Sequence, residues 1–159
     1  MAPATTGALR LIEDTMFAQI TDTYFVSPQL EVQDLHTAKD LGFVRVICNR
    51  PDAEIPVPMQ SAALAKVAED LGLDFKILPI VHSSITPELI EEQKDLIESV
   101  EGKVLAYCAS GNRSTIVWGL GQAKAGTLAP QDIIDRAQAA GYSLEGLRES
   151  LVTLSQDAN

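Results

Sequence analysis

Apolar and polar residues follow two different patterns along this chain, and each pattern predicts one kind of secondary structure. Short runs that are mostly apolar and rich in β-branched residues are typical of strands buried in a parallel sheet. Longer segments with apolar residues every three or four positions are typical of helices with one buried face. The predicted strands are residues 24–27, 44–49, 75–80 and 103–108, and the predicted helices between them are residues 30–41, 58–71 and 86–99.

The alternation of strand and helix predicts an α/β fold with an open, mainly parallel sheet flanked by helices. The functional residues of such a sheet are expected at the carboxyl ends of its strands. Residues 1–16 are predicted to be a flexible N-terminal arm and residues 17–159 a single domain, because no internal repeat or linker interrupts the pattern. After the last strand the pattern is only helical, over residues 113–126, 130–140 and 143–155.

The net charge of the chain excludes some classes of binding partner. The formal net charge is -10 and the isoelectric point is near 4.5, so the field of the protein repels phosphate backbones and anionic membranes. We therefore expect no nucleic-acid and no membrane partner, and any anion site must be local. No apolar stretch approaches the ~20 residues of a bilayer-spanning helix, and the N-terminus lacks a secretory signal pattern. These features predict a cytoplasmic protein.

The two cysteines, Cys48 and Cys108, are too few for a disulfide framework or a cysteine zinc cluster. The sequence also has no His-rich metal motif, so we expect neither a metal nor another cofactor. The two thiols are therefore expected to be either reactive or simply buried.

The stretch KVLAYCASGNRS places Cys108 at the end of a predicted strand and Arg113 at the start of a predicted helix. The residues between them are small or tolerate turns, so their amide N–H groups can converge on one point, and Gly111 can adopt a positive φ. The positive end of the helix faces the same point. The stretch therefore predicts a reactive thiolate in an anion-binding loop, whose members are Ala109, Ser110, Gly111, Asn112 and Arg113.

Other readings of this stretch stay open. Cys108 could be a buried structural cysteine followed by an ordinary turn, although this reading does not explain the arginine. Ser114 could donate a hydrogen bond to the Cys108 thiolate, or it could cap the helix that follows.

Four stretches, ITDTYFVSPQL, GFVRVICNRPDAE, LGLDFKILPIVHSSIT and KVLAYCASGNRSTIVWGLGQAKAG, occur in the order of a known family. They resemble the beta-lactamase hydrolase-like protein, phosphatase-like domain family over roughly residues 18–125, and members of that family are often labelled sulfur transferases. The family is similar in fold to dual-specificity phosphatases. The resemblance implies that Cys108 is the nucleophile, residues 109–113 the anion cradle and Arg113 its charged clamp.

The chain departs from the phosphatase pattern at three positions. Four residues separate Cys108 from Arg113, where phosphatases have five, and this shorter spacing is similar to rhodanese sulfurtransferases. Tyr107 stands where phosphatases usually have a histidine. The VHSSIT loop has no aspartate to protonate a leaving alkoxide, although His82 could substitute as an acid or could be an ordinary loop residue. Because a sulfur leaving group needs no such proton, these departures favour sulfur transfer.

The sequence interpretation is accordingly a sulfurtransferase that moves a sulfane sulfur through a Cys108 persulfide. Its expected partners are a small-molecule or thiol sulfur donor and acceptor, with a separate persulfide-oxidising enzyme, and the oligomeric state stays open. The first alternative is a protein-tyrosine or dual-specificity-like phosphatase that acts through a cysteinyl-phosphate. The second alternative is a non-catalytic anion or redox sensor.

The strand 44–49 should lie beside the Cys108 strand if the fold resembles the phosphatases. Arg50 could then add charge to the pocket or tie Asp52 or Glu54 into its own loop, and Asn49 is expected to hold loop backbone. Cys48 should end near the same pocket rim. It is a candidate resolving thiol for oxidised Cys108, or it is a buried small hydrophobe.

Overall fold

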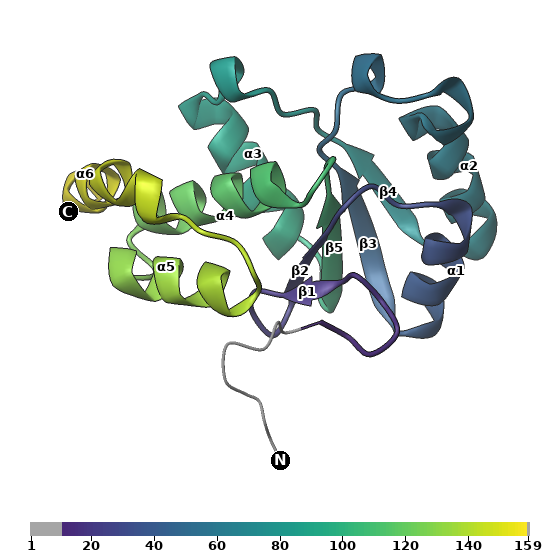
Figure 1. Cartoon of the computed structure of the whole chain (residues 1–159), viewed down its shortest axis with the longest axis horizontal. Coiled ribbons are helices and arrows are strands. Elements are labelled where there is room, and N and C mark those ends of the chain that lie inside the picture. Colours follow the sequence, from purple (N-terminus) through teal and green to yellow (C-terminus); the bar gives the residue numbers. More distant parts are fainter. Residues whose placement is uncertain (1–10, 159) are drawn as a thin grey trace.

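A computed structural model describes residues 11–158 and shows a five-stranded sheet between two layers of helices (Figure 1). The strand order is β1-β2-β5-β3-β4, with β1 antiparallel to β2 and the other neighbours parallel. The predicted α/β fold with a mainly parallel sheet is confirmed. The strands are β1 Ala18–Gln19, β2 Tyr24–Ser27, β3 Phe43–Cys48, β4 Asp74–Ile77 and β5 Lys103–Tyr107.

Helices α1 and α2 cover one face of the sheet, and α3 to α6 cover the other (Figure 1). Each face has its own apolar cluster, one with Leu35 and Leu64 from α1 and α2, the other with Val117 and Ile133 from α4 and α5. The α-helices are α1 Val32–Asp40, α2 Ser61–Leu71, α3 Pro87–Glu98, α4 Asn112–Ala125, α5 Pro130–Ala139 and α6 Arg148–Asp157. Four 3-10 turns are η1 Asp52–Glu54, η2 Val57–Met59, η3 His82–Ser84 and η4 Glu145–Leu147.

The parallel strands bring the loops that follow β3, β4 and β5 to the same edge of the sheet, the upper edge in Figure 1. β5 lies at the centre, between β2 and β3. Its residues 104–107 are fully buried because helices cover both faces. The loop that follows β5 is therefore flanked by chain segments on both sides.

The bounds of several elements differ from the sequence prediction, most clearly at three places. The strand predicted over residues 75–80 ends at Ile77, because Pro79 has no N–H to continue the ladder, although Leu78 and Ile80 still donate to the carbonyl oxygens of Cys48 and Asn49 at 2.9 and 2.8 Å. The last helix begins at Arg148 rather than at residue 143, after the 3-10 turn η4. The short strand β1 has too little periodicity to be predicted.

The N-terminal arm was predicted over residues 1–16, of which residues 1–10 lie outside the described residues. Residues 11–16 form a turn against the sheet: Leu11 makes an antiparallel bridge with Ala18, and the Ile12 N–H donates to the Phe17 carbonyl oxygen at 2.9 Å. Leu11 and Ile12 also pack against the two apolar clusters. This part of the arm is therefore part of the folded domain.

Among residues 11–158, no helix combines the length and the apolar character needed to cross a membrane. The same part of the chain contains no group of three or more His, Cys, Asp or Glu side chains that could hold a metal ion.

Candidate active site

Cys108 follows the last residue of the central strand β5 and is fully buried, with 0% of its surface exposed. The Gly111 N–H donates to its sulfur at 3.1 Å. Gly111 has φ 95°, the left-handed conformation predicted for this glycine, and is the N-cap residue of α4. The chain therefore folds the strand end, the loop and the helix N-terminus around one sulfur atom.

The sequence predicted that the amide N–H groups of the loop converge on one point, but not all of them do. The Asn112 N–H donates to the Ser110 Oγ at 3.2 Å, so this amide already has a partner within the loop. Thr115 Oγ1 donates to the Gly111 carbonyl oxygen at 2.9 Å and fixes the other side of the turn. Ala109 and Ser110 are exposed. The loop thus opens to solvent at these two residues, above the buried sulfur.

Arg113 is held in place by Glu54, a residue that the sequence suggested only as a partner of Arg50. Its Nη1 and Nη2 donate to the two carboxylate oxygens of Glu54 at 3.0 and 2.8 Å, and Nη1 also donates to the Ile80 carbonyl oxygen at 2.8 Å. This bidentate pairing lowers the pKa of Glu54. It also raises the pKa of Arg113, to which the charge of Cys108 contributes in the same direction. Arg113 therefore lies between a carboxylate and the thiol.

Arg50 ties its own loop together, one of the two roles considered for it. It donates to the Glu54 carboxylate at 3.4 Å, to the Glu54 carbonyl oxygen at 2.9 Å and to Gln29 Oε1 at 3.1 Å. Asp52 is not paired with Arg50 but receives the Ser61 N–H and Oγ at 2.8 and 2.9 Å, at the first residue of α2. Asp52 therefore acts at a helix N-terminus.

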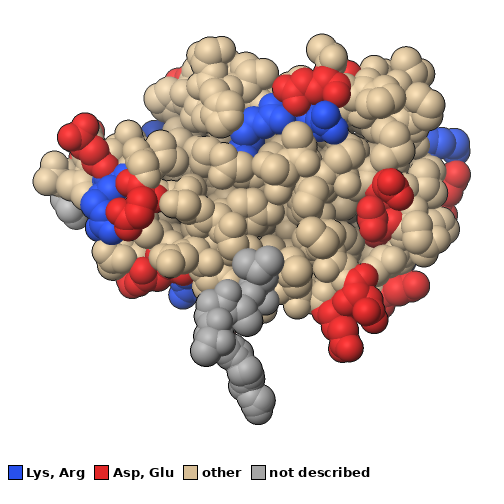
Figure 2. All heavy atoms as spheres, viewed as in Figure 1, with Lys and Arg blue, Asp and Glu red and all other residues tan. Residues whose placement is uncertain are grey.

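The ion pairs form a compact charged cluster, defined here as Arg50, Glu54 and Arg113. Figure 2 shows basic and acidic side chains together at the upper edge of the molecule, in a depression between two mostly uncharged lobes. The cluster has two positive charges and one negative charge, so it is locally cationic in a chain whose net charge is -10. An anion can therefore be attracted at short range although the whole protein repels it.

A buried polar network lies behind the loop. Ser114 Oγ donates to Asn49 Oδ1 at 2.8 Å, so this hydroxyl is committed to Asn49 and does not donate to the Cys108 thiolate as one prediction had it. Asn49 and Gln93 exchange two amide hydrogen bonds, at 2.9 and 3.1 Å. Tyr24 joins the network by accepting from Gln93 Nε2 at 3.2 Å and donating to the Ser114 carbonyl oxygen at 2.8 Å.

All four side chains of this network are fully buried. The network ties β2, the end of β3, α3 and the start of α4 into one unit. The sequence analysis predicted that Asn49 holds loop backbone, and Asn49 Nδ2 indeed donates to the Leu78 carbonyl oxygen at 2.9 Å. Gln93 and Tyr24 were not singled out. The signal for Gln93 was a polar residue three positions from Ile90 and four from Ile97, on the inward face of α3.

His82 is exposed, in the 3-10 turn η3 that follows β4. The structure places it two residues beyond Ile80, whose carbonyl oxygen holds Arg113. It therefore lies in the loop at the same edge of the sheet as Cys108, and among the described residues no hydrogen bond joins it to the buried network. His36, the other histidine of the chain, is an exposed residue of α1.

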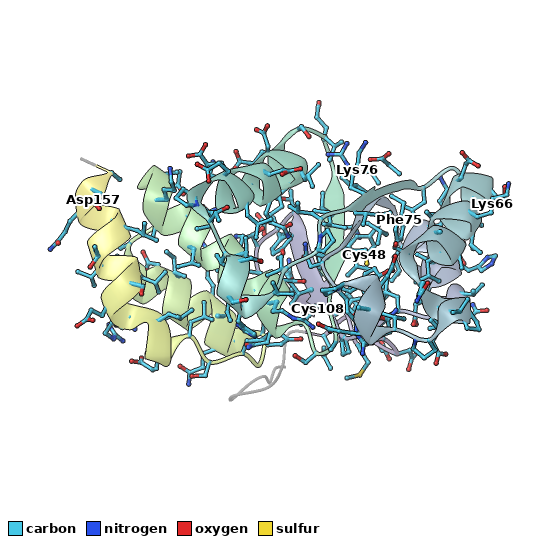
Figure 3. The ribbon with its side chains drawn as sticks, turned by 90° about the horizontal axis from the view of Figure 1, so that it is seen from above. Cys48, Lys66, Phe75, Lys76, Cys108 and Asp157 are labelled. Atoms are coloured by element: carbon cyan, nitrogen blue, oxygen red, sulfur yellow. The ribbon has the colours of Figure 1, made fainter. Side chains whose placement is uncertain are left out.

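The side chains of Cys48 and Cys108 leave the neighbouring strands β3 and β5 in different directions, which does not support the prediction of a shared pocket rim. Cys48 is paired in register with Tyr107, so the two side chains share the face covered by α1 and α2, and both belong to its apolar cluster. Cys108, the next residue along, continues towards the opposite face. Both thiols are free, and Figure 3 shows Cys48 on the side of the helix that carries Lys66.

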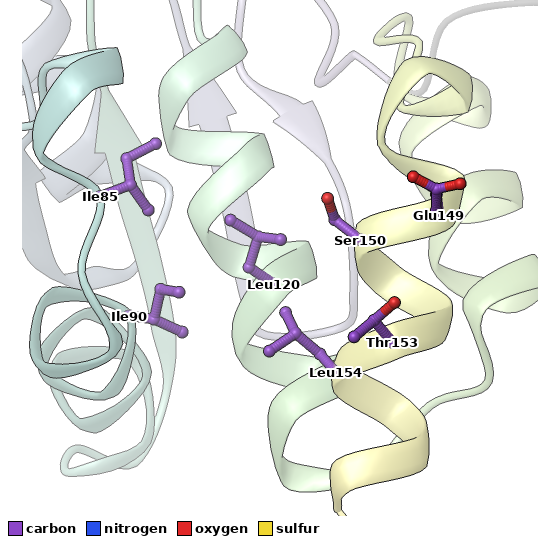
Figure 4. A pocket seen from close by; sticks show the side chains of 7 residues that line it. All are labelled: Ile85, Ile90, Leu120, Glu149, Ser150, Thr153 and Leu154. Atoms are coloured by element: carbon purple, nitrogen blue, oxygen red, sulfur yellow. The ribbon is translucent and has the colours of Figure 1, made fainter.

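A groove of about 380 Å³ lies between the end of η3, α4 and α6 (Figure 4). Ile85, Ile90, Leu120 and Leu154 supply its apolar lining, and Glu149, Ser150 and Thr153 supply its polar rim. None of the residues around Cys108 described above lines it. The groove is therefore separate from the thiol site.

A crystal structure described as that of a "putative phosphatase" from Neisseria meningitidis Z2491 is similar to this chain. The two are 35% identical, the match covers 86% of this chain and 96% of that one, and the TM-score is 0.76. A kinase associated phosphatase, whose structure carries serine in place of its catalytic site cysteine, shares the fold at 15% identity, with 85% and 86% of the two chains covered and a TM-score of 0.63. The predicted cysteine-phosphatase-like fold class is confirmed.

The interpretation of the chain as a sulfurtransferase is wrong. The model of its family describes a phosphatase-like domain, and the 35% identical structure is described as a phosphatase and not as a sulfurtransferase. Both findings favour the phosphatase alternative. The interpretation failed because it relied on local departures from the phosphatase pattern, namely the Cys108–Arg113 spacing, Tyr107 and the missing aspartate, which do not define the fold around the loop.

The family comparison covers most of the chain. A curated relative, the beta-lactamase hydrolase-like protein of Agrobacterium fabrum, is 27% identical over 126 residues. These residues are 79% of this chain and 29% of the relative, so the chain corresponds to less than a third of that protein. The family model itself matches residues 16–125, which include every residue of the thiol site described above. The chain belongs to the family of the beta-lactamase hydrolase-like protein, phosphatase-like domain.

Proposed function

We propose that this domain hydrolyses phosphomonoesters through a cysteinyl-phosphate on Cys108. The observation that carries the proposal is the geometry of Cys108, whose sulfur receives the Gly111 N–H at 3.1 Å and whose charge acts on the Arg113 guanidinium that Glu54 holds with two hydrogen bonds. An amide donor, a helix N-terminus and an arginine fork suit both a thiolate and the oxygens of a phosphoryl group.

In the first step the Cys108 thiolate attacks phosphorus. The S–P bond forms, the ester P–O bond breaks, and the leaving oxygen takes a proton from His82. In the second step water attacks phosphorus, the S–P bond breaks, and the proton of the water passes to His82. Phosphate leaves and the thiolate is restored. Arg113 binds the phosphoryl oxygens in both steps.

The position of His82 affects which phosphate esters the domain should hydrolyse best. No aspartate occurs in the VHSSIT loop, and His82 is exposed and makes no hydrogen bond among the described residues. Proton donation to the leaving oxygen is therefore less well organised than it would be from a buried acid. Phenols, with a pKa near ~10, need less help than alcohols. The domain should therefore prefer aryl phosphates to alkyl phosphates.

The test is hydrolysis of para-nitrophenyl phosphate by the full chain, with Cys108→Ser as the control. We expect saturable release of phosphate and, after rapid acid quench, a phosphorylated protein that Cys108→Ser does not form. Orthovanadate should inhibit competitively. Binding of orthovanadate with no turnover of either aryl or alkyl phosphates would instead indicate a module that only binds anions and would overturn the proposal.

A further inference from the structure

Tyr142 reaches the Cys108 loop from a segment beyond the part of the chain that the family model matches, residues 16–125. Its N–H donates to the Ala137 carbonyl oxygen at 2.8 Å, at the end of α5, and Gly141 with φ 97° turns the chain at that point. The ring packs against the apolar cluster of the α3–α6 face. Tyr142 therefore has a fixed position relative to the core.

The Tyr142 hydroxyl donates to the Ser110 carbonyl oxygen at 2.8 Å. This carbonyl and the Gly111 N–H belong to the same peptide group, and in a trans peptide the two point in opposite directions. On the other side of that peptide, the Gly111 N–H donates to the Cys108 sulfur at 3.1 Å. A chain of two hydrogen bonds therefore leads from the Tyr142 hydroxyl through one peptide to the sulfur.

The absence of a side chain at Gly111 makes room for the Tyr142 hydroxyl as well as allowing the turn. A Cβ atom added at Gly111 would lie 2.1 Å from the Tyr142 Oη and 2.8 Å from Cζ, so a side chain there would collide with the ring. The hydroxyl also remains a donor at neutral pH, because burial, with a smaller contribution from the charge of Cys108, raises the pKa of Tyr142 to about 12. The contact is therefore close, directional and permanent over the working pH range.

We propose that Tyr142 is a positioning residue that stabilises the Cys108 thiolate through the Ser110–Gly111 peptide. A donor on the carbonyl side polarises the peptide, which makes its N–H a stronger donor to negative sulfur. It also holds the peptide in the orientation that aims the N–H at Cys108. The inference rests on the proposed function only in that the thiolate is the nucleophile of that reaction; the hydrogen-bond chain itself involves no substrate.

The test is a pH titration of thiolate absorbance near 240 nm on the full chain, without substrate. Burial raises the pKa of Cys48, and Cys108→Ser supplies the baseline, so the absorbance that this variant lacks reports Cys108. Tyr142→Phe removes only the hydroxyl and keeps the ring packing. We expect the titration midpoint to move up by about 0.3 to 0.5 pH unit, as loss of part of a charge-assisted hydrogen bond requires.

Tyr107→Phe is the matched control. It also removes a buried tyrosine hydroxyl, but from a side chain that shares the α1–α2 face with Cys48 and lies on the other side of the strand from Cys108. Its midpoint should stay at the wild-type value. A Tyr142→Phe shift below about 0.2 unit, or an equal shift in Tyr107→Phe, would overturn the proposal.

A second measurement separates this role from a merely structural one. The Gly111 amide proton resonance should move upfield in Tyr142→Phe, because its hydrogen bond weakens, while amides of α5 and α6 stay in place. An unchanged Gly111 resonance would count against the proposal. Neither measurement needs turnover, so a protein that hydrolyses no phosphomonoester still tests the role of Tyr142, and failure of the proposed function remains distinguishable from failure of this inference.

Discussion

Glu54 holds Arg113 with both carboxylate oxygens, at 2.8 and 3.0 Å, from a loop that is 59 positions away in the sequence. The pairing sets the direction in which the guanidinium points, and Ile80 adds a third contact at 2.8 Å. The Glu54 and Ile80 contacts use both protons of Nη1 and one proton of Nη2, so Nε and the second Nη2 proton are left to bind an anion. Two predictions depend on this relationship.

Arg113→Lys should lower kcat/KM for para-nitrophenyl phosphate by at least ~100-fold. The single ammonium group of a lysine cannot pair with both carboxylate oxygens of Glu54 and at the same time present two donors to a phosphoryl group. Steady-state kinetics and far-ultraviolet circular dichroism would measure the effect and confirm the fold. Wild-type kinetics in this variant would show that Arg113 has only a structural role.

Glu54→Gln should remove a pH-dependent part of the stability. Arg113 lowers the pKa of Glu54 in the folded protein, so protonation favours the unfolded chain. The contribution is fully present above the ordinary carboxyl value of about 4.3 and is lost as the pH falls through the lowered folded value. The difference in Tm between wild type and variant should therefore be largest near pH 6 and should shrink below pH ~4.

The equivalent substitution of an exposed carboxylate in the middle of α3, Glu92→Gln, is the control, because its side chain has no hydrogen bond or ion pair among residues 11–158. Its difference in Tm should vary less with pH than that of Glu54→Gln. A Glu54→Gln difference that is equally large at pH 3 and pH 6 would mean that the ion pair does not contribute in the way we infer.

Asn49→Ala should destabilise the protein by about 2–3 kcal/mol, measured by urea unfolding, because it leaves Gln93 and Ser114 buried with unsatisfied groups. Replacing both amides, as Asn49→Leu with Gln93→Leu, should cost less than the sum of the two single changes. Gln33→Leu, on the exposed side of α1, is the control for adding an apolar side chain. Additive costs would show that the two amides do not act as a pair.

His82→Ala should slow hydrolysis more for phenyl phosphate than for para-nitrophenyl phosphate, by about tenfold or more. The poorer leaving group needs the proton, whereas para-nitrophenolate leaves without it. The chain has 2 histidines, so His36→Ala, on exposed α1, is a matched control and should behave as wild type. Equal effects on both esters would remove His82 from the proton transfer.

Mild peroxide should not produce an intramolecular disulfide between Cys48 and Cys108. Cys48 belongs to the apolar cluster of the α1–α2 face, and its sulfur donates to the Arg50 carbonyl oxygen at 3.4 Å. Intact mass under non-reducing conditions, with Cys48→Ala for comparison, would measure this. A disulfide that Cys48→Ala abolishes would show that the strand ends rearrange more easily than the packing suggests.

The positions of the strands and helices could be predicted because each depends on a local period. Residues 24–27 match β2, and the Cys108–Arg113 loop has the positive φ that its glycine predicted. Element ends were predicted less well where a single residue decides them, as Pro79 does at the end of the edge strand. The failed interpretation, sulfur transfer, also depended on local features, among them the number of residues between Cys108 and Arg113.

The contacts that complete the site could not be predicted, because they join distant segments. Glu54 meets Arg113 across 59 positions, Gln93 meets Asn49 across 44, and Tyr142 meets Ser110 across 32. Each of these residues is an ordinary polar residue in its own segment. Only the arrangement of the parallel strands and of the α5–α6 connection brings them to the thiol.

Both outer strands of the sheet are short. β1 has two residues, and β4 has four, of which Asp74 and Lys76 are charged, with Pro79 soon after. Unpaired strand edges are the places where sheets of separate molecules join and aggregate, and short, charged or proline-limited edges prevent this. The open sheet is therefore expected to stay confined to one molecule, so that concentrated protein should resist strand-mediated aggregation.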